Sequence, residues 1–100
     1  MTAAPSAPVE QAAAAHAQHI LAADMGAIQR DCSAQVLQEP ADLYQQLVTA
    51  TFERYTILGH AKIGWHHVLK IRYFGATTAT VHHRFGAVDG TWVVLESERV

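Results

Sequence analysis

The sequence predicts an α+β domain in which helices pack on one face of a curved antiparallel sheet. Apolar residues recur at helical spacing in the first half of the chain, whereas they alternate with period 2 after residue 53. Breaks at Gly64, Gly75 and the pair Asp89-Gly90 divide the second half into four segments. Helices followed by a meander of strands are typical of a sheet that is covered on one side.

Length and composition agree with a single globular domain. The chain has 100 residues, of which 50% are apolar and 16% are charged, enough to form one core. Residues 1–8 contain Pro5 and Pro8 and are predicted to be a disordered tail. Residues 9–100 are therefore predicted to form the whole domain.

Two helices are expected before residue 33. Residues 9–23 are predicted to form one helix, because their spacing places on one face Val9, Ala13, His16, Ile20 and Ala23. Asp24 suits the N-cap of a second, shorter helix, whose buried side would be Met25 and Ile28.

A short strand is predicted over residues 33–38, and a further helix over residues 40–53. Pro40 fits the first turn of that helix, where no backbone N–H is needed. The stripe that predicts the helix is Leu43, Tyr44, Leu47, Val48, Thr51 and Phe52.

Four strands complete the predicted domain, at residues 54–63, 65–74, 77–85 and 91–100. Asp-Gly is the preferred pair for a two-residue type I′ hairpin, so Asp89-Gly90 should connect the last two strands. A regular ladder from that turn places His83 opposite Glu96 on the inner face. A carboxylate beside an imidazole orients the ring and raises its pKa.

Two histidine doublets stand out, His66-His67 and His82-His83. Neighbouring side chains on a strand point to opposite faces, so each doublet is split. His67 and His83 should point towards the helices, and His66 and His82 away from them. The split argues against a metal site, which needs about three ligands around one point. Two interpretations of the inward histidines remain, a satisfied core residue and a pocket residue.

Several classes of function are not expected. The dispersed Lys and Arg residues form no basic stripe for nucleic acid. No apolar run reaches the roughly 20 residues that a membrane span needs. Cys32 is the only cysteine, which excludes an intrachain disulfide. The first residues lack the cationic and apolar regions of a signal peptide, so we expect a cytoplasmic protein. We also expect no cofactor.

The chain resembles the NTF2-like superfamily over about residues 9–100. The resemblance rests on the segment DMGAIQRDCSAQVLQEP, on the helix and meander that follow it, and on the hairpin DGTWVV. Ketosteroid isomerases, SnoaL-type polyketide cyclases, scytalone dehydratase and limonene epoxide hydrolase belong to this superfamily.

The resemblance implies a cone, in which a bent sheet wraps a helix around an apolar pocket. The wall of that pocket would consist of His16, Tyr44, Trp65, His67, Tyr73, His83 and Phe85, with Glu39 and Glu96 as its carboxylates. It also implies a homodimer through the sheet face that the helices leave free. Val68, Phe74, Val93 and Leu95 fall on that face, where exposed apolar side chains favour a partner.

The resemblance implies only some of the catalytic groups of a ketosteroid isomerase in this chain. Glu39 precedes Pro40 where the family has its general base, and His16 lies near the position of an oxyanion-hole tyrosine. Val81 stands near the second donor and cannot donate, so a standard steroid isomerase is not expected.

We therefore expect an NTF2-like homodimer with an apolar pocket for a small hydrophobic molecule. One alternative is an enzyme that uses Glu39, His16, His83 and Glu96 for acid/base chemistry. The other is a non-catalytic module for dimerisation or protein binding.

Overall fold

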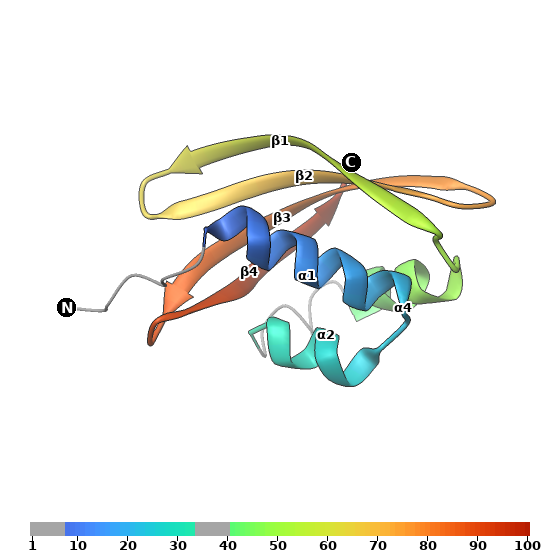
Figure 1. Ribbon diagram of the computed structural model, residues 1–100, viewed down its shortest axis with the longest axis horizontal. Helices are drawn as coiled ribbons and strands as arrows, with labels where there is room; N and C mark the ends of the chain where they lie inside the picture. Colours follow the sequence, from blue (N-terminus) through green and yellow to red (C-terminus); the bar gives the residue numbers. More distant parts are fainter. Residues whose placement is uncertain (1–7, 34–40) are drawn as a thin grey trace.

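Helices cover one face of a four-stranded antiparallel sheet in the computed structural model, which describes residues 8–33 and 41–100 (Figure 1). The helices of this part of the chain are α1 (Val9–Leu21), α2 (Met25–Asp31) and α4 (Ala41–Thr49). The strands are β1 (Arg54–Ile63), β2 (His66–Phe74), β3 (Thr78–Val88) and β4 (Thr91–Arg99). This arrangement confirms the predicted α+β class. The predicted strand at 33–38 lies outside the described residues except for Ser33, and so do Glu39 and Pro40.

Helix α1 lies across the sheet and buries the stripe that its sequence predicts. Its buried residues are Val9, Ala13, His16, Ala17 and Ile20. Two of these are alanines, which allow the helix backbone to approach the sheet closely. The helix ends at Leu21 and not at Ala23, because Ala23 takes a positive φ of 54° that turns the chain towards α2.

Helix α2 begins at the cap that the sequence predicts. The Asp24 carboxylate accepts a hydrogen bond from the backbone N–H of Ala27 at 3.1 Å. Ile28 is fully buried, whereas Met25 is only partly buried against the core.

We expect Asp24→Ala to lower the free energy of unfolding by about 1 kcal/mol, because an end N–H of α2 loses its acceptor. Asp24→Asn is the matched control, since its amide oxygen still accepts from Ala27. Urea denaturation of the two variants measures the difference. Equal stability of both variants would show that the cap contributes nothing.

The sheet has the strand order β1-β2-β3-β4, with each strand antiparallel to the next. Asp89 and Gly90 have φ values of 50° and 76°, as a type I′ hairpin requires. The chain therefore turns between β3 and β4 where the sequence predicts it. Each of the four strands begins and ends within three residues of its predicted bounds.

A β-bulge in β4 changes the expected pairing of His83. Phe85 pairs with Val94, but Arg84 pairs with Glu96, so Leu95 is an extra residue in β4. The Leu95 side chain lies over Gly86, where an added Cβ would come within 2.5 Å of it. His83 consequently pairs with Ser97, and the predicted pairing of His83 with Glu96 is wrong.

The core lies between the helices and the inner face of the sheet. Leu69, Ile71 and Tyr73 of β2 and Val81 and Phe85 of β3 are buried there, as their alternation predicts. Trp65 departs from this pattern. It precedes β2, and its side chain is 64% exposed.

Candidate functional site

Four elements bring polar side chains together in the middle of the core. His16 comes from α1, Tyr44 from α4, His83 from β3 and Ser97 from β4, and all four are buried. The Tyr44 hydroxyl lies 2.9 Å from His16 Nε2 and 2.8 Å from Ser97 Oγ. These residues form the centre of what we call the buried polar chain.

The outer end of the buried polar chain is Asp31, the last residue of α2. Its Oδ2 atom lies 2.8 Å from His16 Nδ1 and 2.5 Å from His19 Nδ1. A carboxylate only accepts, so both imidazoles donate to it through Nδ1. In the neutral form of His16, Nε2 is then an acceptor, and the Tyr44 hydroxyl donates to it.

The inner end of the buried polar chain is Tyr73. Its hydroxyl lies 2.8 Å from His83 Nε2 and donates to that nitrogen, which is its hydrogen-bond partner within the described residues. A neutral His83 then carries its proton on Nδ1 and donates to Ser97 Oγ at 2.8 Å. Ser97 in turn donates to Tyr44. Every hydrogen bond therefore runs in one direction, from Tyr73 to Asp31, and no member lacks a partner.

Burial keeps the inner members of the chain neutral. It lowers the pKa of His83 well below its usual value, and the neighbouring His16 and His82 add to that effect. Burial also raises the pKa of the Tyr44 and Tyr73 hydroxyls, so both remain donors. For Asp31, burial alone would raise the pKa, but the hydrogen bonds from His16 and His19 lower it.

Cys32 lies beside the buried polar chain, which does not activate its thiol. Burial raises the pKa of its thiol to about 11. A buried thiol with such a pKa is a poor nucleophile at neutral pH.

The predicted pocket residues converge only in part, and those that converge are buried and pack against one another. His16, Tyr44, Tyr73, His83 and Phe85 contact one another directly, with ring centroids of His16 and His83 5.0 Å apart. The histidines are thus satisfied core residues. This was one of the two interpretations that the sequence left open.

The remaining predicted site residues lie elsewhere. Trp65 lies just before β2 and is exposed. His67 forms a hydrogen bond with His60 at 2.8 Å and an edge contact with Trp92, away from the buried polar chain. Glu96 is exposed on the outer face, where the β4 bulge places it. Glu39 lies outside the described residues.

Sequence reasoning missed three members of the buried polar chain: Asp31, His19 and Ser97. His19 lies one helical turn from His16, and Asp31 ends the helix that Asp24 begins, so their proximity could have been considered. Ser97 could not have been found, because the bulge that turns it inward has no clear signal in the sequence.

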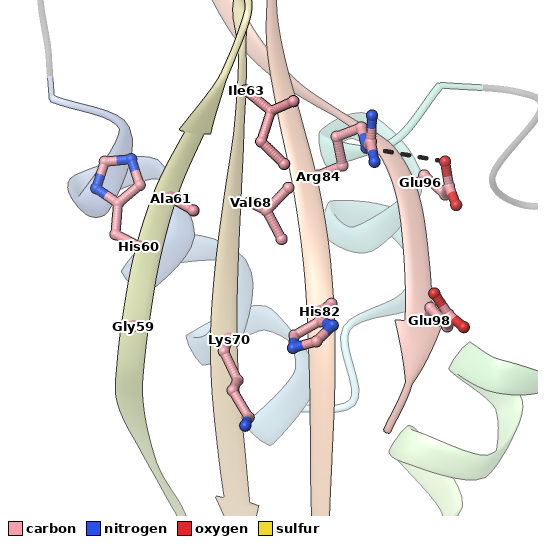
Figure 2. Close-up of a pocket in the computed structure, with 10 residues that line it drawn as sticks. All are labelled: Gly59, His60, Ala61, Ile63, Val68, Lys70, His82, Arg84, Glu96 and Glu98. Carbon is pink, nitrogen blue, oxygen red and sulfur yellow. Dashed lines mark ion pairs between the residues drawn. The ribbon is translucent and has the colours of Figure 1, made fainter.

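An open groove of about 450 Å³ lies on the outer face of the sheet, the face that the helices leave free (Figure 2). Ala61, Ile63 and Val68 form its apolar part. Its charged residues are Lys70, Arg84, Glu96 and Glu98, and His82 also lines it. The groove contains none of the aromatic residues predicted for a pocket.

The cations and carboxylates of the groove lie on different strands. Lys70 is on β2 and Arg84 on β3, whereas Glu96 and Glu98 are on β4 (Figure 2). Arg84 Nε lies 3.9 Å from Glu96 Oε2. The Glu96 side chain is 62% exposed and the Arg84 side chain 36% exposed, so solvent screens this pair and it stabilises the fold only slightly.

Comparisons with protein-family models, with curated proteins and with solved structures give no match to this chain. Within residues 8–33 and 41–100, no three His, Cys, Asp or Glu side chains are grouped so that they could hold a metal ion. None of the helices in the same ranges has both the length and the hydropathy for a membrane crossing. The buried polar chain and the groove on the outer face are therefore the two candidate functional sites.

Proposed function

We propose that this protein is a non-catalytic NTF2-like module that acts as a homodimer, with the outer face of its sheet as the interface. The order of its elements, helices and then a meander, supports the NTF2-like assignment. The observation that carries the proposal is the outer face, which none of the described helices covers and where Ile63 and Val68 line a groove among charged residues. Apolar side chains on a free sheet face favour a protein partner.

The state of the core supports a non-catalytic role. His16 and His83, the candidate acid/base groups, are both fully buried and already hydrogen-bonded to Asp31, Tyr44, Tyr73 or Ser97. A general base must reach the proton that it removes. In this packing, no substrate atom can approach either imidazole without displacing core side chains.

Light scattering at micromolar concentration tests the dimer. We expect a mass of twice the chain mass of 10.9 kDa for the wild-type protein. Val68→Glu should give the monomer mass, because a buried unpaired carboxylate opposes association. The matched control Ala15→Glu adds the same charge at an exposed position of α1 and should remain dimeric.

A monomeric wild-type protein would overturn this proposal and favour the second candidate. That candidate is a monomeric binder of a small hydrophobic molecule, with the groove as its site. The groove volume of about 450 Å³ supports it, since small-molecule sites in proteins commonly measure about 300–1,000 Å³.

A further inference from the structure

Two histidines of neighbouring strands face each other near the turn between β1 and β2, apart from the buried polar chain. His60 Nε2 lies 2.8 Å from His67 Nδ1, and the two ring centroids are 5.0 Å apart. The hydrogen bond between the rings is exposed to solvent. A small ion can therefore reach these two nitrogen atoms from solution.

A β-bulge in β1 brings His60 to the side of the sheet where His67 lies. Leu58 is an extra residue in β1, where the pairing with β2 shifts by one position. After the bulge, His60 pairs with the core residue Leu69, whereas a regular ladder would pair it with Val68 of the outer face. Its ring accordingly points away from Val68 (Figure 2). Bulges often direct a side chain to a functional site in this way.

A carboxylate from α1 lies behind His60. Glu10 Oε2 is 3.6 Å from His60 Nδ1, and the Glu10 side chain is 56% exposed, so it is free to rotate closer. A carboxylate at this position favours the proton on Nδ1 and leaves the lone pair of Nε2 available. Histidines that bind metal ions in proteins commonly have a carboxylate behind the ring in this arrangement.

His67 is suited to be the second ligand. Burial lowers its pKa, and the charges of His60 and Lys62 lower it further while Glu10 opposes them, so the ring is neutral at pH 7. Movement of its proton to Nε2 then frees the lone pair of Nδ1. Two nitrogen atoms that bind one metal ion at right angles, each about 2 Å from it, are about 2.9 Å apart. The observed 2.8 Å is close to this value.

We propose that His60 Nε2 and His67 Nδ1 bind one divalent transition-metal ion, with Cu²⁺ preferred, and that Glu10 positions the His60 ring. Imidazole is a ligand for Cu²⁺, Ni²⁺ and Zn²⁺, and Cu²⁺ binds most tightly in this series. The right angle between the two nitrogens fits adjacent positions of a square-planar Cu²⁺ ion. Within the described residues, no three His, Cys, Asp or Glu side chains are grouped to hold a metal ion, so water would complete the coordination.

The tryptophan fluorescence of the untagged full-length chain at pH 7 tests this site, because bound Cu²⁺ quenches a nearby indole. Trp92 forms an edge contact with His67, with ring centroids 5.3 Å apart. We expect quenching to saturate at one equivalent of Cu²⁺. Trp65→Phe should retain this quenching, and Trp92→Phe should lose most of it.

Four variants assign the ligands by isothermal titration calorimetry with Cu²⁺. We expect His60→Ala and His67→Ala each to weaken binding at least about tenfold, because one of two protein ligands is lost. Glu10→Gln should weaken it about tenfold through the orientation of His60. His66→Ala is the matched control, since His66 precedes His67 but contacts Arg84. It should leave the affinity unchanged. Circular dichroism melting establishes that each variant is folded.

The outcomes are separate from those for the homodimer, which light scattering measures without added metal. Equal Cu²⁺ affinity of His60→Ala and wild type would overturn the site, and so would a loss of binding in His66→Ala. Unchanged binding in Glu10→Gln would show that this carboxylate does not position His60. One equivalent that requires both His60 and His67 supports the site, whether the protein is a dimer or a monomer.

Discussion

Replacement of His83 by alanine is expected to lower the free energy of unfolding by about 3–5 kcal/mol. The imidazole is fully buried and partners both Tyr73 and Ser97. Its removal leaves a cavity and deprives two buried hydroxyl groups of a hydrogen-bond partner. Because a domain of this size is commonly stable by only about 5–15 kcal/mol, much of the folded population would be lost on modest heating.

His82→Ala is the matched control for this prediction. His82 is the neighbouring residue on β3, but it lies on the outer face and is only partly buried. We expect the control to change stability by less than about 0.5 kcal/mol. Chemical denaturation of both variants gives the comparison. A His83→Ala variant as stable as the control would mean that the imidazole lines an open pocket and is not part of a filled core.

Lowering the pH is expected to destabilise the protein from about pH 6.5 downwards. Burial holds the pKa of His83 well below its usual value of 6.5, so the unfolded chain binds this proton more readily than the folded one. The contribution of neutral His83 is complete above pH 6.5 and is lost as the pH falls. One such group changes stability by about 1 kcal/mol for each pH unit in this range.

Urea denaturation at a series of pH values measures this slope, and His83→Ala provides the control. The variant is less stable throughout, but its stability should depend less on pH between 6.5 and 5. The pKa of Asp31 is lowered below 3.8, so its contribution persists over that interval and is lost only in more acidic solution. Parallel slopes for the variant and the wild type would exclude His83 as the titrating group.

Most of the fold follows from local patterns in the sequence. Each helix has an apolar stripe, the strands alternate, and Asp89-Gly90 has the one conformation that closes a tight hairpin. These signals act over a few neighbouring residues, which is why they can be read without coordinates. The end of α1 was placed two residues too late and the end of α4, at Thr49, four residues too late, because Ala23 and Thr51 give no indication that they adopt a positive φ.

The candidate site was less predictable, because it depends on contacts between distant elements. His16, Tyr44, His83 and Phe85 were expected to meet, and they do. Whether they line a cavity or fill it depends on packing that no local pattern encodes. The charged groove was not foreseen either, since it needs the register of all four strands.

The bulge in β4 also determines which single-residue deletion that strand can accommodate. The extra residue Leu95 interrupts the alternation of β4 side chains between the two faces of the sheet. Glu96 and Glu98 therefore stay on the outer face, while Ser97 points inward and reaches His83. Loss of Leu95 would restore a regular ladder and keep every charge on its present face. Loss of Ser97 would instead bring Glu98 to the position beside His83. Deletions at positions 95 and 97 therefore differ in kind: the first keeps every charge outside, and the second is equivalent to burying a charge.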